Sequence, residues 1–314
     1  MSPALWGGRR VLSLLIGGLV LTVGAVLVTR HAAALRAAAV DIGPGALAAS
    51  TALAALGTVL IFQVWSVLLA GLGAAVGNRG AAGVFFLSQL GKYVPGSVWP
   101  VVAQMEFGHQ RGIPRRTMLT ANLLMLSLLT ATGLVVGAAL LPWSSSGGLS
   151  RYWWTLAALI PLGVLLHPRT IPAALDLLLG LVGRERLGVR ASSRSMLVAT
   201  LWSFGVWVLM GLHVLVLTRA LGATGVTAAA AAVGGMALGW AAGLILVPAP
   251  AGAGVRDAVL VATFAPQIGS APALAVALAS RVVLILVDVA LAGIGAGALA
   301  TRHRRPEASR PSEP

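Results

Sequence analysis

The sequence predicts an all-α polytopic membrane protein, because it has few charged residues, a high apolar content and several long apolar runs. Only 10% of its 314 residues are charged, and 58% are hydrophobic. A soluble domain carries roughly 25% charged residues. This chain therefore lacks the polar side chains needed to cover a water-exposed surface, and we expect lipid to surround it.

The charged residues are mostly basic, with 22 Lys and Arg against 8 Asp and Glu, a net charge of +14. On a soluble protein this excess would suggest a nucleic-acid partner. Here the arginines lie mostly between apolar runs, where they are typical of topology signals and lipid-headgroup contacts, so we expect no nucleic-acid binding. The absence of cysteine excludes disulfides and thiolate metal sites. We expect neither a metal nor a cofactor.

Six apolar stretches approach the roughly 20 residues that a membrane-spanning helix needs. The first is longer than the apolar core of a signal peptide, about 7–15 residues, so we interpret it as a helix. The fourth is short and contains Pro161. The six predicted spans are Val11–Thr29, Ala46–Val76, Thr117–Leu141, Tyr152–His167, Ser195–Thr218 and Pro272–Ala300.

Two further apolar stretches, Gly83–Gly108 and Thr227–Phe264, are interrupted near their middle by Pro and Gly. Proline removes a helical hydrogen bond and clashes with the preceding turn. Non-helical backbone at membrane depth is tolerated only where protein buries it or where it lines a cavity. Each stretch is therefore either a re-entrant helical hairpin or a discontinuous spanning helix.

The distribution of arginines favours two hairpins. With six full crossings and both broken stretches returning to their starting side, fifteen arginines lie on the side of the N-terminus. Four lie on the other side: Arg30, Arg36, Arg151 and Arg219. This bias follows the positive-inside rule and predicts cytoplasmic N- and C-termini. A topology in which both stretches cross the membrane is the rival.

The order helix, helix, hairpin, helix then occurs twice, over residues 11–141 and 152–300. Because the two copies begin on opposite sides, the chain is predicted to be an inverted-topology repeat, an architecture of many transporters. We expect one integral membrane domain over residues 1–300. Residues 301–314 are rich in Arg, Pro, Ser and Glu and are predicted to form a disordered tail.

The first broken stretch contains Lys92 and Tyr93 just before its break and Ser97 at the start of the next helix. Ser97 can cap that helix, and a helix N-terminus beside a lysine is suited to bind an anion. The alternative is that Lys92 reaches the membrane surface and Tyr93 belongs to an aromatic belt.

The second broken stretch places Arg256 and Asp257 directly after a Pro- and Gly-rich segment. The planar guanidinium of arginine suits phosphate. The alternative is that Asp257 neutralises Arg256 in a purely structural pair. Within the last span, Arg281 and Asp288 lie seven residues apart, too far to pair with each other, so we expect each to contact a partner elsewhere in the protein.

Other features predict packing. Gly235, Gly239 and Gly243, and likewise Gly293 and Gly297, are spaced for close approach of helices. We interpret His213, in an apolar span, as a buried packed residue.

The segment Gln89-Leu90-Gly91-Lys92-Tyr93-Val94-Pro95-Gly96, the pattern Pro248-x-Pro250-x-Gly252-x-Gly254-x-Arg256-Asp257, and Arg281 together resemble the membrane domain of bacterial lysylphosphatidylglycerol synthase/flippase proteins. The resemblance covers nearly the whole chain. Ala251 and Asp257 depart from the expected pattern, in which glycine and glutamate are usual. The resemblance implies a multi-pass protein of the bacterial cytoplasmic membrane that translocates lipid. Because only 14 residues follow the last span, we expect no synthase activity.

We therefore expect a translocase for a phospholipid or a polyprenyl-phosphate-linked lipid. The alternatives are a membrane-embedded lipid or glycan transferase and a non-catalytic partner in envelope assembly. The expected partners are anionic or polyprenyl-phosphate lipids, with self-association or an envelope enzyme left open. The side chains expected to bind the lipid phosphate are Lys92, Tyr93, Ser97, Arg256, Asp257 and Arg281.

Overall fold

The computed structural model describes residues 40–74, 78–93, 98–181, 183, 185, 191–246 and 254–303, and throughout these ranges the regular structure is helical. Within these ranges, five helices are long and apolar enough to cross a membrane. They are α3 (Pro44–Gly71), α6 (Arg115–Leu140), α11 (Ser193–Ala220), α12 (Gly225–Leu246) and α14 (Ser270–His303).

Four of these helices confirm spans predicted from apolar runs, namely α3, α6, α11 and α14. The predicted span Val11–Thr29 lies outside the described residues. Large apolar side chains on four of the spans are exposed on the protein surface, as at Leu56, Leu201, Leu244 and Ile294. Single exposed leucines are ordinary, but here they lie on helices that are themselves long enough to span a bilayer.

The predicted span Tyr152–His167 is wrong as a single helix. The chain forms three short helices there, α7 (Gly148–Tyr152), α8 (Trp154–Ala157) and α9 (Leu159–Leu165), followed by α10 (Thr170–Leu181). Pro161, in the first turn of α9, has no N–H to donate to the carbonyl of Ala157, so a hydrogen bond that would join α8 to α9 is missing. The α8–α9 segment meets α10 at a bend of 84°, and only the two together are long enough to count as a sixth span.

Each of the two broken stretches contains a helix on either side of its break. The first has α4 (Asn78–Gln89), the 3₁₀ turn η1 (Leu90–Tyr93) and α5 (Trp99–His109); the second has α12 and α13 (Val255–Ile268). The breaks themselves, residues 94–97 and 247–253, lie outside the described residues. The second pair is unequal, because α12 runs for 22 residues before its break whereas α13 has 14.

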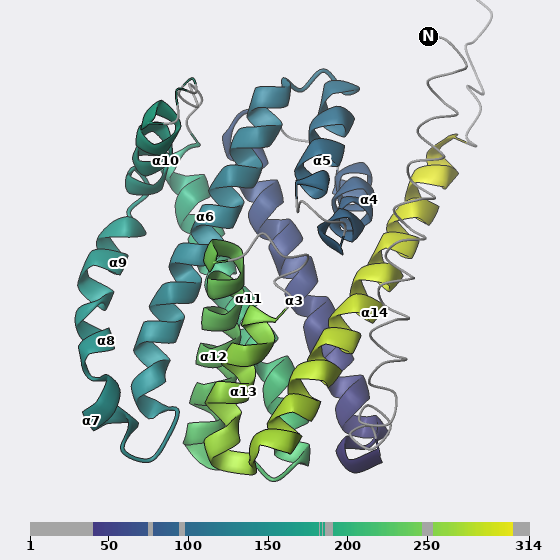
Figure 1. The fold of residues 1–314 in the computed structure, drawn as a ribbon. Helices are drawn as coiled ribbons and strands as arrows, with labels where there is room; N and C mark the ends of the chain where they lie inside the picture. Colours follow the sequence, from purple (N-terminus) through teal and green to yellow (C-terminus); the bar gives the residue numbers. More distant parts are fainter. Residues whose placement is uncertain are drawn as a thin grey trace, which may run out of the picture.

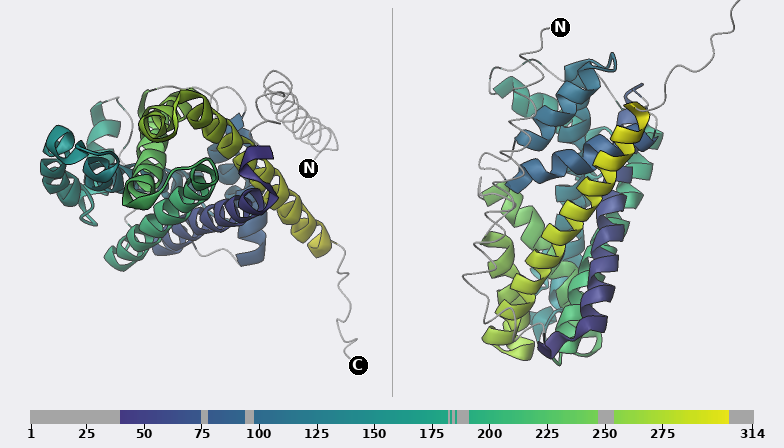
Figure 2. Two further views of the ribbon diagram at one scale, coloured as in Figure 1. Left: turned by 90° about the horizontal axis from the view of Figure 1, so that it is seen from below. Right: turned by 90° about the vertical axis from the view of Figure 1, so that its right-hand side faces the viewer.

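The two broken stretches lie at opposite ends of the bundle. Figure 1 shows α4 and α5 together near its upper end and α12 and α13 together near its lower end. The members of each pair pack against each other. Helix α14 runs along the side of the bundle beside α3, α4 and α13, as the turned views in Figure 2 show.

Glycines allow several of these helices to approach closely. A Cβ on Gly239 would lie 3.2 Å from atoms of Arg256 in α13, and one on Gly235 would lie 3.1 Å from Thr263. The predicted packing of α12 through these two glycines is therefore confirmed. For Gly293 and Gly297 the predicted packing is not seen among the described atoms, where a Cβ at either position would have nothing within 4 Å.

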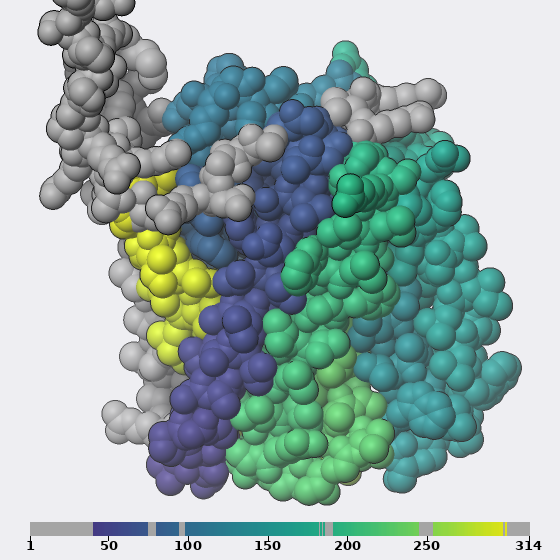
Figure 3. Space-filling model, turned by 180° about the vertical axis from the view of Figure 1, so that it is seen from behind, coloured from purple at the N-terminus to yellow at the C-terminus, as the bar shows by residue number. Residues whose placement is uncertain are grey.

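The closest glycine contact of α14 instead involves Gly295, where an added Cβ would lie 2.9 Å from the backbone oxygen of Gly83 in α4. Helices α3 and α11 also pack along each other and lie side by side in Figure 3. The interior of the bundle is filled by large side chains, including fully buried Trp65, Phe85 and Trp207. Helix α14 extends to His303, so the first three residues of the predicted tail are helical.

Candidate functional site: an internal cavity between the two broken stretches

Lys92 and Tyr93 lie in η1, the tight turn that ends the first half of the broken stretch 83–108. Gly91 is required here, because a Cβ at this position would lie 2.9 Å from the Cβ of Trp99 at the start of α5. Lys92 Nζ lies 2.7 Å from Asp288 Oδ2, and the Tyr93 hydroxyl donates a hydrogen bond to the same oxygen.

Arg256 and Asp257 occupy the first turn of α13. Asp257 Oδ2 accepts a hydrogen bond from Arg281 in α14 and a longer one, of 3.4 Å, from the backbone N–H of Gly254. An acidic side chain in the first turn of a helix is favoured by the positive end of the helix dipole. The Arg256 guanidinium lies 3.6 Å from Asp257 Oδ1, beyond hydrogen-bond distance.

Lys92, Arg256 and Arg281, with the acids Asp257 and Asp288, form a cluster of charged side chains. Of the three bases, Arg256 has the weakest contact with an acid. Its residue is only 8% exposed. Among the described atoms, Arg256 Nε has no hydrogen-bond partner, and neither has Asp257 Oδ1. A buried N–H without an acceptor costs free energy. The guanidinium therefore has unused capacity to bind an anion.

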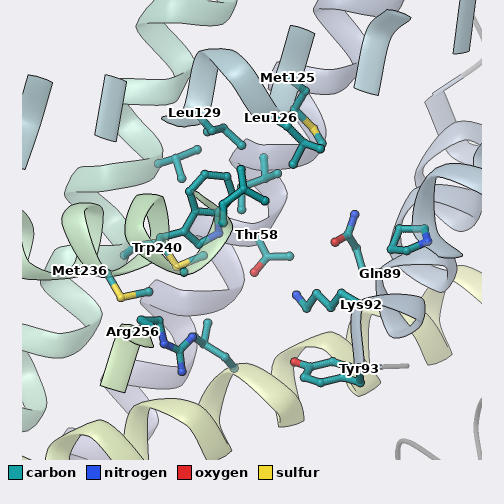
Figure 4. Close-up of a pocket in the computed structure, with 18 of the residues that line it drawn as sticks. Thr58, Gln89, Lys92, Tyr93, Met125, Leu126, Leu129, Met236, Trp240 and Arg256 are labelled. Carbon is teal, nitrogen blue, oxygen red and sulfur yellow. The ribbon is translucent and has the colours of Figure 1, made fainter. Parts of the chain in front are cut away.

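A cavity of about 290 Å³ lies between the two broken stretches. One part of its wall is charged, formed by Lys92, Tyr93, Arg256 and Arg281. The rest is largely apolar and comes from α3, α5, α6, α11, α12 and α14, including Ile61, Val101, Met125, Leu126, Leu129, Met236, Trp240, Leu244, Leu284 and Ile285. Figure 4 shows Lys92 and Tyr93 facing Arg256 across the lower part of the cavity, and Met125, Leu126 and Leu129 along its upper edge.

Two helices begin at this cavity. Pro100 and Val101, in the first turn of α5, and Arg256, in the first turn of α13, all line it. The backbone N–H groups of a first turn have no partner within the helix and carry partial positive charge. The first turns of both helices therefore add positive potential to the region that already holds the basic side chains.

Four of the six residues predicted to bind lipid phosphate thus share one cavity, namely Lys92, Tyr93, Arg256 and Arg281. Asp257 is not among the residues that line it and acts through its contacts with Arg281 and Arg256. Ser97 lies outside the described residues. The N-cap of α5 is Val98, whose side chain makes no capping hydrogen bond.

The expectation that Arg281 and Asp288 each have a separate partner is confirmed. Arg281 binds Asp257, and Asp288 binds Lys92 and Tyr93. Asp288 was not predicted as a site residue, although it holds two residues of the site in place. The sequence contained the signal, an aspartate in the middle of an apolar helix, where a charge is costly without a partner.

His213 is fully buried, as predicted, and joins three helices. Its Nδ1 lies 2.7 Å from Ser50 Oγ in α3, and its Nε2 lies 2.9 Å from Ser280 Oγ in α14. Ser280 is the neighbour of Arg281, so this network supports the wall of the cavity. Within the described part of the chain, no group of three His, Cys, Asp or Glu residues is arranged to hold a metal ion.

The long apolar helices with their exposed aliphatic side chains define a multi-pass membrane protein. The family model described as the lysylphosphatidylglycerol synthase TM region matches residues 10–292. The chain therefore belongs to this family, as its motifs predicted, and the match covers nearly its whole length. No curated protein sequence matches the chain significantly.

Proposed function

We propose that the protein is a translocase that moves a phospholipid or a polyprenyl-phosphate-linked lipid across the cytoplasmic membrane. The observation that carries the proposal is the composition of the cavity wall. Basic side chains from both broken stretches and from α14 lie at one part of it, and apolar side chains form the rest. A lipid needs both surfaces, one for its phosphate and one for the first part of its chains.

Arg256 is the group best suited to bind the phosphate. It is buried, lines the cavity, and has an Nε without an acceptor among the described atoms. Arginine binds phosphate oxygens through two parallel N–H groups, and such charge-assisted bonds are stronger than neutral ones. Gly239 leaves room for the Arg256 side chain, because a Cβ at this position would lie 3.2 Å from Arg256 Cγ.

We further propose that α4–α5 and α12–α13 are re-entrant hairpins that enter the membrane from opposite faces, in the two halves of an inverted repeat with cytoplasmic termini. The positions of the two pairs at opposite ends of the bundle support this arrangement. In transporters built this way, the binding site lies at the interface of the repeats near the membrane midplane. The basic residues of the cavity wall include residues next to both breaks, which supports a site between two such repeats.

The ion pairs of the site favour a translocase over a transferase. General acid–base chemistry in glycan and lipid transfer needs a carboxylate positioned to exchange a proton with the substrate. Here the carboxylate of Asp288 is bound by Lys92 and Tyr93, and that of Asp257 by Arg281. Both acids therefore serve to hold basic residues in position.

The test is lipid transfer between leaflets in reconstituted liposomes that contain a tail-labelled fluorescent phosphatidylglycerol, measured by quenching of the outer leaflet. We expect the wild-type protein to accelerate the transfer. Arg256→Met should slow it by about tenfold or more, because the variant loses a charge-assisted hydrogen bond to the phosphate. Arg256→Met should fold normally, because Asp257 keeps its bond to Arg281.

The matched control is Arg151→Met, which also removes one arginine but lies at an exposed position in α7, away from the cavity. It should transfer lipid at the wild-type rate. Equal rates in protein-free liposomes and in liposomes with wild-type protein, both for phosphatidylglycerol and for a polyprenyl-phosphoryl lipid, would refute the translocase. Equal rates for wild-type protein and a folded Arg256→Met variant would refute the role of Arg256.

A further inference from the structure

Both acidic side chains beside the cavity are already bound by basic side chains of the protein. Asp288 is 3% exposed and its Oδ2 is bound by the Lys92 ammonium group and the Tyr93 hydroxyl. Asp257 Oδ2 accepts from Arg281 and from the Gly254 N–H. A cationic group on a ligand would have to displace Lys92 or Arg281 to reach either carboxylate at these oxygens.

The charge of the cluster can be counted. Three bases (Lys92, Arg256 and Arg281) and two acids (Asp257 and Asp288) leave one positive charge. The residues of the two breaks, Val94–Ser97 and Val247–Ala253, include no ionisable side chain. The count therefore does not depend on how those segments are placed.

The position of the excess charge is also defined. Lys92 and Arg281 each have a carboxylate in close contact, at 2.7 Å for Lys92, whereas Arg256 has only the 3.6 Å contact with Asp257. The uncompensated charge thus belongs to Arg256, on the opposite side of the cavity from Lys92 in Figure 4. A single negative charge bound there would neutralise the cluster, and a buried charge is tolerated only when it is paired.

We propose that the cavity selects lipids whose head group carries one phosphodiester charge and no cationic group, and that it discriminates against aminoacylated lipids such as lysylphosphatidylglycerol. This inference rests on the proposed translocase function. The shared chemistry is a phosphodiester monoanion, which comes either from a phospholipid such as phosphatidylglycerol or from a polyprenyl-phosphoryl sugar. A lysyl head group would add ammonium charge to a site that is already positive. A diphosphate-linked lipid would bring more negative charge than Arg256 can neutralise.

The experiment compares transfer rates of three tail-labelled lipids in liposomes of neutral phosphatidylcholine. They are phosphatidylglycerol, lysylphosphatidylglycerol and a polyprenyl-phosphoryl hexose. We expect at least one phosphodiester monoanion to move about tenfold faster than lysylphosphatidylglycerol, a difference equivalent to about 1.4 kcal/mol. If phosphatidylglycerol moves faster, the natural ligand is a phospholipid. If the polyprenyl-phosphoryl hexose moves faster, the natural ligand is a polyprenyl-phosphoryl sugar.

A charge-altering variant tests the cause of this selectivity. Lys92→Met frees the carboxylate of Asp288 for a ligand cation, so the rate for lysylphosphatidylglycerol relative to phosphatidylglycerol should rise. Lys92→Arg keeps the pair and should keep the wild-type preference. If Lys92→Met does not fold, Asp288→Asn provides the second test, because its additional positive charge should favour phosphatidic acid, a phosphomonoester, over phosphatidylglycerol.

The outcomes separate the two proposals. Equal transfer of phosphatidylglycerol and lysylphosphatidylglycerol by wild-type protein, both slowed by Arg256→Met, would overturn the selectivity and leave the translocase intact. An unchanged preference in folded Lys92→Met, or in Asp288→Asn, would also overturn it. Transfer of none of the three lipids would overturn both proposals.

Discussion

The ammonium group of Lys92 lies 2.7 Å from the carboxylate of Asp288, which connects the end of the first half of the broken stretch 83–108 to the middle of α14. The two partners differ in environment, since the side chain of Asp288 is 2% exposed and that of Lys92 is 34% exposed. The carboxylate is therefore the more costly of the two groups to leave unpaired.

We expect Lys92→Met to lower thermal stability in detergent more than Asp288→Asn does. The first variant leaves a buried carboxylate without its counter-charge, whereas the second leaves a lysine that is partly exposed and an amide that can still accept from Tyr93. In the double variant, which carries both Lys92→Met and Asp288→Asn, the two losses of stability should not add. Their coupling free energy should be about 0.5–3 kcal/mol, as for other groups in direct contact. Additive losses in this double-mutant cycle would show that the ion pair contributes no net stability.

The sequence predicted the main spans because a continuous apolar run of sufficient length has few structural alternatives in a membrane. It did not predict the shape of residues 148–181, where an apolar run forms short helices and the chain then bends by 84°. The break predicted around Pro248 agrees with the end of α12 at Leu246. Apolar length and the positions of Pro and Gly therefore show where a helix is interrupted, but not the angle at which the chain continues.

The residues of the candidate site were predictable in kind but not in pairing. The cost of a charge within a span required a partner for Arg281 and another for Asp288. Which side chains become these partners depends on how α4, α13 and α14 pack, and the sequence alone does not show that packing. The sequence left open a pair between Asp257 and Arg256, whereas Asp257 in the structure is bound most closely by Arg281.

The contact between Gly295 and Gly83 offers a test of the packing of α4 on α14. Gly295→Ala places a Cβ 2.9 Å from the Gly83 backbone oxygen, which cannot move away without displacing α4. We expect a destabilisation of about 1–3 kcal/mol, typical of overpacking, measured by thermal unfolding in detergent. The matched control is Gly293→Ala on the same helix, where the new Cβ has nothing within 4 Å among the described atoms. Equal stability of the two variants would contradict the close contact.

The buried network of Ser50, His213 and Ser280 should stabilise the junction of α3, α11 and α14. Ser50 Oγ donates to the backbone oxygen of His213, so its contact with Nδ1 places the ring proton there and leaves Nε2 to accept from Ser280. We expect His213→Ala to cost about 2–5 kcal/mol, as other large-to-small changes in a core do. Ser50→Ala, which removes only one hydroxyl, should cost about 1 kcal/mol. A His213→Ala protein as stable as the wild type would show that the network contributes nothing.

The proposed topology can be tested by labelling single cysteines, since the natural chain has none. Gln110 follows α5, Thr224 precedes α12 and Ser270 begins α14, and all three are exposed. With two re-entrant hairpins, a membrane-impermeant maleimide should reach Gln110→Cys only from the cytoplasmic side and Thr224→Cys only from outside. If both stretches instead crossed the membrane, these two results would be exchanged, whereas Ser270→Cys should react from outside in either case and serves as the control. The exchanged result would also remove the reason for placing the cavity at the interface of an inverted repeat, because that interface exists only if each half contains a hairpin that returns to its starting side.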